Sequence, residues 1–92
     1  MTYRILYTNT FKKALKLCLK RGCDERKFAC VIETLKTTGK LPLEYRPHIL
    51  SGRLAGYTEC HITSDWLLIW KQDDSEMTVT LADTGTHSDI FG

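Results

Sequence analysis

The stretch Trp66-Leu67-Leu68-Ile69-Trp70 decides the fold of this 92-residue chain. Five large apolar residues in succession place apolar side chains on both faces of a strand, so both faces need cover. This pattern is typical of the central strand of a sheet with helices on one face and partial shielding on the other. We therefore predict a strand at 66–71 in the middle of the sheet.

Two neighbouring segments alternate with the period of two that is typical of strands. Residues 57–62 precede the central strand across the short turn Thr63-Ser64, and residues 77–82 follow it after a turn at 72–76. Short turns join antiparallel neighbours. We therefore expect three consecutive strands connected as hairpins.

The first half of the chain has a different period. After a short strand at 3–7, apolar residues recur with helical spacing in two runs, Phe11, Ala14, Leu15, Cys18 and Leu19, then Phe28, Val31, Ile32 and Leu35. Candidate N-caps stand at residues 8–10 and at Asp24. Gly22 and Gly39 suit the left-handed residue that ends a helix.

These segments predict an α+β fold in which an N-terminal strand and a two-helix hairpin pack on an antiparallel sheet of about four strands. Residues 40–55 have no steady period and are expected to form a loop, which in a small domain often carries function. The length fits a single domain over residues 1–92, ending in a short tail.

Composition excludes several classes of protein. With 42% hydrophobic and 26% charged residues, the chain is neither disordered nor fibrous. Its first residues lack the long apolar region of a signal peptide and no apolar run would span a bilayer, so we expect a cytoplasmic protein without a membrane partner. The four cysteines are expected to be reduced thiols without zinc, because no Cys-x-x-Cys pair is present. No cofactor is indicated.

Charge is unevenly distributed along the sequence. Residues 1–56 carry twelve Lys and Arg against four acids, whereas residues 57–92 carry one Lys against seven acids. The basic half indicates an anionic partner, either a nucleic acid or an acidic protein. The alternative is a solvated helix surface that happens to be rich in lysine.

All three histidines lie in the second half, at positions 48, 61 and 87. Asp65 opens the strand that follows the His61 strand, so we expect these two side chains to lie near one another. If the last strand pairs beside the central one, His87 approaches the same place. As an alternative, three histidines and a carboxylate would suit a metal, but none of them has the short spacing of helical ligands.

Imidazoles and a carboxylate beside cations are what metal-free RNA cleavage requires. One group takes the proton of a ribose 2′-hydroxyl, another gives a proton to the departing 5′-oxygen, and cations hold the phosphorane charge. Histidine can serve either role near neutral pH. Arg46 and Arg53 are the nearest cations in the sequence.

Aromatic side chains offer surfaces for unpaired bases. Trp66, Trp70, Tyr57 and Phe91 are candidates for stacking. For both tryptophans and Tyr57 the alternative is a place in the core. Phe91, next to the C-terminus, fits a core less well.

Three strings in the second half resemble the signatures of YafQ-like toxins of the RelE family. They are Gly56-Tyr57-Thr58-Glu59-Cys60-His61-Ile62, Asp65-Trp66-Leu67-Leu68-Ile69 and Thr84-Gly85-Thr86-His87-Ser88-Asp89-Ile90-Phe91. Leu41-Pro42-Leu43 and the spacing of His48, Leu50 and Gly52 resemble the middle loop of that family. The resemblance spans nearly the whole chain and is specific over residues 48–91.

This resemblance implies a RelE-type fold, an mRNA interferase that acts with the ribosome, and a small antitoxin as partner. It also implies that His48, His61, Asp65 and His87 are the active residues. Phe91 matches a C-terminal aromatic suited to base stacking, and Glu59 matches an acidic position of the site.

The chain departs from the family pattern at four positions. Thr58 and Asp83 stand where arginine is common, so two candidate phosphate-binding cations are missing. Ser64 replaces a common proline, and Pro47 stands where an aspartate often precedes the loop histidine. Weaker activity, or a cation supplied by Arg53 or ribosomal RNA, would follow.

The sequence thus favours a type II toxin that cleaves mRNA on the ribosome without metal. His87 is the expected general acid, His48 or Asp65 the base, and His61 a residue that orients or shares the proton. RNA contacts are expected from Arg53, Trp66 and Phe91, with ribosomal RNA docking by Lys12, Lys13 and Lys16. The alternatives are a toxin of the same fold that binds a topoisomerase without chemistry, and an inactive member that acts through its antitoxin complex.

Overall fold

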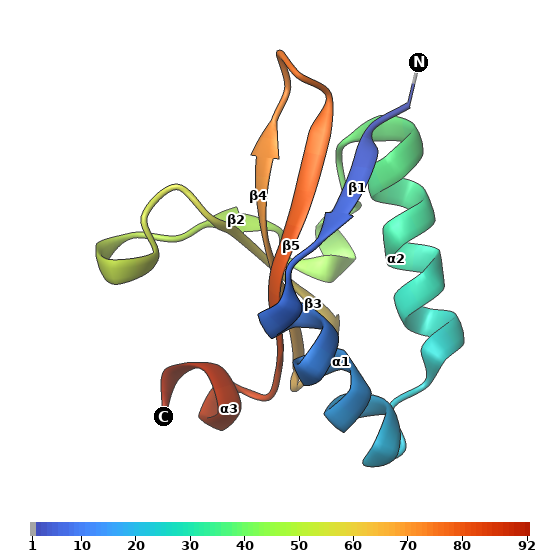
Figure 1. Ribbon diagram of the computed structural model, residues 1–92, viewed down its shortest axis with the longest axis vertical. Coiled ribbons are helices and arrows are strands. Elements are labelled where there is room, and N and C mark those ends of the chain that lie inside the picture. Colours follow the sequence, from blue (N-terminus) through green and yellow to red (C-terminus); the bar gives the residue numbers. More distant parts are fainter. Residues whose placement is uncertain (1) are drawn as a thin grey trace.

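The computed structural model describes residues 2–92 and contains a five-stranded sheet with helices on both sides (Figure 1). The helices are α1 (Asn9–Lys20), α2 (Glu25–Thr38) and α3 (His87–Phe91), with 3-10 turns η1 (Leu43–Tyr45) and η2 (Gly52–Leu54). The strands are β1 (Arg4–Tyr7), β2 (His48–Ile49), β3 (Thr58–Thr63), β4 (Trp66–Asp73) and β5 (Thr78–Gly85). The predicted α+β class is confirmed.

The strand order is β1-β5-β4-β3-β2, so the apolar strand β4 is central, as predicted. The pairs β3–β4 and β4–β5 are antiparallel hairpins. The sheet is mixed and not purely antiparallel, because β1 pairs with β5 in parallel. The two helices and two hairpins between these strands bring β5 alongside β1 so that both strands run in the same direction.

The helices begin and end at the predicted signals. The Thr8 hydroxyl accepts from the Phe11 N–H at 3.1 Å and caps α1. Asp24 accepts from the Arg26 N–H at 2.9 Å and caps α2. Gly39 takes a φ of 71° and donates its N–H to the Leu35 carbonyl, which closes α2.

The main core lies between the helical hairpin and one face of the sheet. Phe28 stacks on Phe11 at 5.8 Å and on Trp66 at 6.4 Å between ring centroids. Trp66 is only 3% exposed, and its indole N–H donates to the Thr84 hydroxyl at 2.9 Å. This corrects the expectation of base stacking by Trp66, because the ring belongs to the core.

One strand and one helix were not predicted, and both are short, while one predicted strand is longer than expected. Strand β2 lies inside the expected loop, β5 runs on to Gly85, and the expected tail contains α3. Two paired residues or five helical ones are too few to establish a period. Each of these elements carries or borders a histidine.

The four cysteines are free thiols. Cys18 and Cys60 are buried, whereas Cys30 is exposed. Burial raises the pKa of the Cys60 thiol to about 12. Among residues 2–92, no helix combines the length and apolar character needed to cross a membrane.

Candidate active site

The titratable residues gather on the sheet face opposite the helical hairpin. The register aligns His48 with Glu59, Glu59 with Ile69, and Ile69 with Asp83, which makes one row across four strands. Because side chains alternate along a strand, His61 points to the same face as Glu59. We call this the open face of the sheet.

Glu59 links two of the histidines. Its Oε1 lies 3.2 Å from His48 Nε2 and 3.8 Å from His61 Nε2. The other ring nitrogen of His48, Nδ1, lies 2.9 Å from the Arg46 carbonyl. A carbonyl only accepts, so Nδ1 carries a hydrogen and donates it to Arg46, while Nε2 faces the carboxyl group of Glu59.

Glu59 is 4% exposed, which is unusual for a carboxyl group. Its Oε2 and the Nδ1 of His61 are buried without a hydrogen-bond partner within the described residues. Leaving such groups unpaired costs about 1–3 kcal/mol each. Buried polar groups retained at this cost are typical of a functional site.

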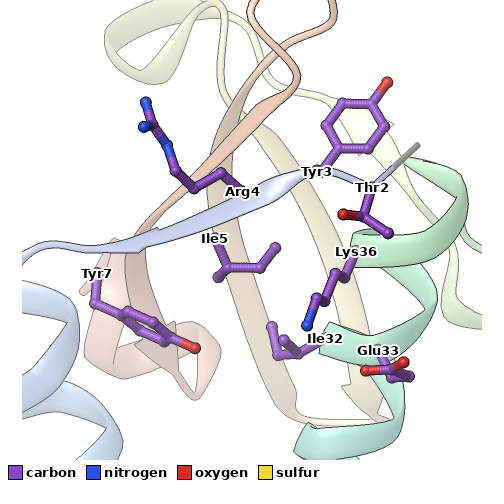
Figure 2. A pocket seen from close by; sticks show the side chains of 8 residues that line it. All are labelled: Thr2, Tyr3, Arg4, Ile5, Tyr7, Ile32, Glu33 and Lys36. Atoms are coloured by element: carbon purple, nitrogen blue, oxygen red, sulfur yellow. The ribbon is translucent and has the colours of Figure 1, made fainter.

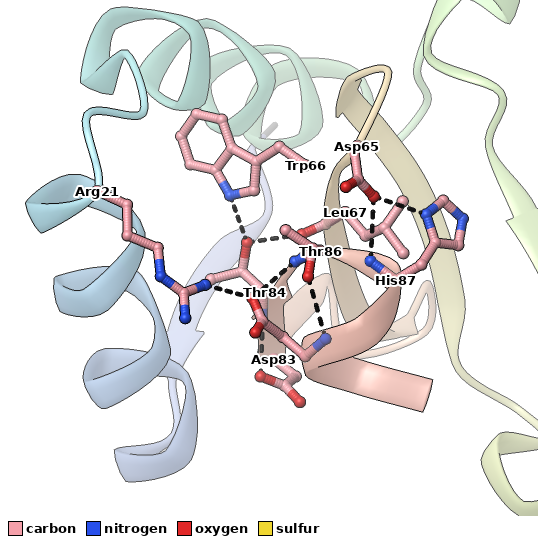
Figure 3. A network of polar contacts seen from close by, with 9 residues as sticks. Arg21, Asp65, Trp66, Leu67, Asp83, Thr84, Thr86 and His87 are labelled. Carbon is pink, nitrogen blue, oxygen red and sulfur yellow. Dashed lines mark hydrogen bonds and ion pairs between the residues drawn. The ribbon is translucent and has the colours of Figure 1, made fainter. Parts of the chain in front are cut away.

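His87 is held by Asp65. The Oδ1 of Asp65 accepts from the His87 backbone N–H at 3.1 Å and lies 2.8 Å from Nδ1 of its ring (Figure 3). These hydrogen bonds, the one to the ring first, lower the pKa of Asp65. The opposite ring nitrogen of His87 remains available to a substrate.

His61 lies between the His48–Glu59 pair and the Asp65–His87 pair. Its Nε2 approaches Glu59, and its ring centroid lies 5.6 Å from that of His87. The sequence placed Asp65 beside His61, whereas the hydrogen bonds of Asp65 go to His87. The expected approach of His87 to the start of the central strand is found. His48, His61, Asp65, Glu59 and His87 thus form one connected group.

Of the two predicted cations, Arg46 lies beside a histidine of this group and Arg53 lies beside the C-terminal aromatic. Arg53 in η2 lines a hollow of about 150 Å³ with Phe91, which is 48% exposed. Arg46 lines a second hollow, of about 240 Å³, with His61. Phe91 therefore presents an accessible ring near an exposed guanidinium.

The remaining predicted residues lie elsewhere. Trp70 is buried in the core, and Tyr57 is half-buried with the Lys71 ammonium 5.7 Å from its ring centroid. Lys12, Lys13 and Lys16 are exposed on α1. Asp83, where the family pattern has arginine, lies in the open-face row, and burial raises its pKa.

Residues 2–92 contain no group of three or more His, Cys, Asp or Glu side chains arranged to hold a metal ion. A larger hollow, of about 510 Å³, runs along β1 and α2 (Figure 2). Residues such as Ile5, Tyr7 and Lys36 line it. None of the histidines borders it, so it is separate from the site.

A mixed five-stranded sheet with a helical hairpin on one face and clustered histidines on the other defines a small toxin of the RelE-like type. Residues 3–92 match the family model described as "Bacterial toxin of type II toxin-antitoxin system, YafQ". The chain therefore belongs to the YafQ toxin family.

Known relatives agree with this assignment. The mRNA interferase toxin YafQ of Escherichia coli K12 is 36% identical over 89 residues, which cover 96% of this chain and 95% of the relative. The crystal structure of YafQ from E. coli BL21(DE3) gives a TM-score of 0.89 at 34% identity, covering 98% and 99% of the two chains. YafQ in the E. coli DinJ-YafQ toxin-antitoxin complex gives 0.89 at 33% identity over the full length of both chains.

Proposed function

We propose that this chain is an endoribonuclease of a type II toxin-antitoxin pair that cleaves mRNA on the ribosome. The observation that carries the proposal is the connected group of three histidines and two carboxylates on the open face. The group contains separate donors and acceptors for the two proton transfers of RNA cleavage. Cytoplasmic action follows, since the substrate is mRNA under translation.

The reaction is an internal displacement at phosphorus. The 2′-oxygen loses its proton and bonds to phosphorus, and the bond to the 5′-oxygen breaks as that oxygen takes up a proton. The products are a 2′,3′-cyclic phosphate and a 5′-hydroxyl. No other reactant is consumed.

His87 is the general acid in this mechanism. Asp65 fixes its ring through Nδ1, which leaves Nε2 to give a proton to the 5′-oxygen. The hydrogen bonds that lower the pKa of Asp65 make this carboxyl a poor proton acceptor, so we assign the role of base to the His48–Glu59 pair, in which Nε2 of His48 turns from Glu59 Oε1 to take the proton of the 2′-hydroxyl. His61 lies between the two pairs and orients them.

Surrounding residues bind the RNA. We assign Arg53, which lies beside Phe91, to the negative charge of the phosphorane and the exposed Phe91 ring to stacking on a base. The exposed lysines of α1, Lys12, Lys13 and Lys16, dock on ribosomal RNA. Since E. coli YafQ forms a complex with DinJ, we also propose a small antitoxin as partner of this chain.

Primer extension on a reporter mRNA tests the proposal. Induction of the wild type should produce new in-frame cleavage sites, and His87→Ala should reduce cleavage by roughly 10²- to 10⁴-fold, the usual contribution of a general acid. Ser88→Ala, at the next exposed position of α3, is the control and should cleave normally. Growth arrest with intact mRNA would instead indicate a target that is bound and not cleaved.

A further inference from the structure

The helix that carries His87 is too short to be stable by itself. Helix α3 has five residues, whereas isolated helices need about 12–15 residues to persist in water. Phe91 stands on the same helix. The position of both residues therefore depends on what anchors α3 to the rest of the fold.

A capping box forms the first anchor. The Asp89 N–H donates to the Thr86 hydroxyl at 3.1 Å, and the Thr86 N–H donates to Asp89 Oδ2 at 2.9 Å. Gly85 allows α3 to fold this closely against β5. It has a φ of 151°, and a Cβ there would lie 2.9 Å from both Cβ and Oδ2 of Asp89.

The second anchor comes from the other side of the sheet. Arg21, the C-cap residue of α1, reaches α3 and places Nη1 2.8 Å from the same Oδ2 of Asp89 (Figure 3). The Thr86 amide and then the Arg21 guanidinium lower the pKa of Asp89, which keeps the cap ionised. One carboxylate oxygen thus receives the capping amide and a cation from a distant helix.

We propose that Arg21 is a positioning residue for His87, acting through Asp89 and the α3 cap. This inference rests on the proposed ribonuclease function. Within the described residues, the Arg21 side chain bonds to Asp89 and to none of the histidines, so we give it no part in the chemistry. By fixing Asp89, it sets the direction in which α3 leaves β5, and thereby the place of the His87 ring between Asp65 and His61.

An ordinary surface ion pair predicts a different outcome. The side chains of Arg21 and Asp89 are 49% and 30% exposed, and such pairs contribute little to global stability. Catalysis is more sensitive, because a misplacement of about 1 Å can cost up to roughly 10²-fold in rate. The proposal therefore predicts a loss of rate with little loss of stability.

The chain offers a matched control. Arg26 pairs with Asp24, the N-cap of α2, at 3.4 Å, in an ion pair that is also exposed. Removing Arg26 takes away the same charge and the same kind of contact, but at a cap that carries no histidine. The comparison of Arg21→Ala with Arg26→Ala separates positioning from a general loss of positive charge.

The experiment measures the rate of mRNA cleavage at a fixed toxin concentration, with ribosome-bound mRNA at saturating and limiting concentrations. For Arg21→Ala we expect about a tenfold lower kcat with KM within about twofold of wild type, and partial recovery in Arg21→Lys. Arg26→Ala should match the wild type in kcat. A kcat for Arg21→Ala equal to that of Arg26→Ala, or a loss confined to KM, would overturn the proposal.

Amide hydrogen exchange on the same variants needs no RNA. The N–H groups of Thr86, His87 and Asp89 all donate within this network, so Arg21→Ala should speed their exchange while the amides of β4 stay protected. Unchanged exchange at these three positions would refute the proposal. If the wild type cleaves no RNA, the ribonuclease function fails, and exchange alone decides whether Arg21 holds His87.

Discussion

The two faces of the central strand β4 are both buried, yet they are built differently. On the helix side, Leu68 and Trp70 pack among apolar side chains of α1 and α2. On the open face, Leu67 and Ile69 are equally buried, but their cross-strand neighbours include Glu59, His61 and Asp83. One face contributes stability through apolar burial, while the other retains unpaired polar atoms beside the reacting groups.

The sharpest contrast between the faces is expected from two phenylalanines. Phe11 is fully buried on the helix side, so Phe11→Ala should lower the free energy of unfolding by about 3–5 kcal/mol. Phe91 is exposed, so Phe91→Ala should leave stability almost unchanged and reduce cleavage. Urea unfolding and cleavage per folded molecule measure both effects. Equal losses of stability would remove the distinction between the faces.

Glu59→Gln tests whether the open face sacrifices stability for activity. The substitution keeps the shape but removes a buried charge with an unpaired oxygen, so the urea midpoint should stay the same or rise. Cleavage should fall by roughly 10²-fold, because His48 loses its proton partner. Glu33→Gln on the exposed surface of α2 is the control. A large drop in stability with normal cleavage would show Glu59 to be structural.

The smallest effect is expected at Asp83, whose pKa is raised by burial. When a carboxyl has a higher pKa in the folded state, its protonation favours folding, and this contribution to stability is fully present below its unfolded pKa of about 3.9. The contribution is lost as the pH rises through the pKa of the folded state. Asp83→Asn should therefore have a slightly higher Tm than wild type at pH 7 and an equal Tm at pH 3.

Asp73 provides a control of opposite sign. The Ser75 hydroxyl, followed by backbone N–H groups, lowers its pKa, so this carboxyl stabilises the fold above its unfolded pKa and ceases to do so as the pH falls through the folded value. Asp73→Asn should have a lower Tm than wild type at pH 7, with the difference vanishing at low pH. Shifts of the same sign for both variants would contradict the role of burial at Asp83.

Periodicity was sufficient for the long elements and failed for the short ones. The two helices, their caps and the central place of β4 follow from patterns that extend over many residues. Strand β2 has only two residues, so no periodic pattern predicted that it pairs with β3. The contact between His48 and Glu59 depends on that pairing and could not be predicted without it. The parallel pairing of β1 depends on how the whole chain returns, which local sequence does not encode.

The site was predictable where topology alone determines it. His87 approaches Asp65 because β5 ends beside the start of β4, and this follows from strand order. Trp66 was misassigned because a strand apolar on both faces does not indicate which face a given residue occupies. The contact of Arg21 with Asp89 joins residues 68 positions apart, and no local motif predicts it.

The distribution of thiols makes the protein suitable for site-specific labelling. Cys18 and Cys60 are buried, and burial raises the pKa of both, so they will resist alkylation. Cys30 is exposed on α2, and Cys23 is intermediate. With Cys23 replaced by serine, a fluorophore on Cys30 would report on the assembly of this protein with partners from the helical side, leaving the open face unmodified.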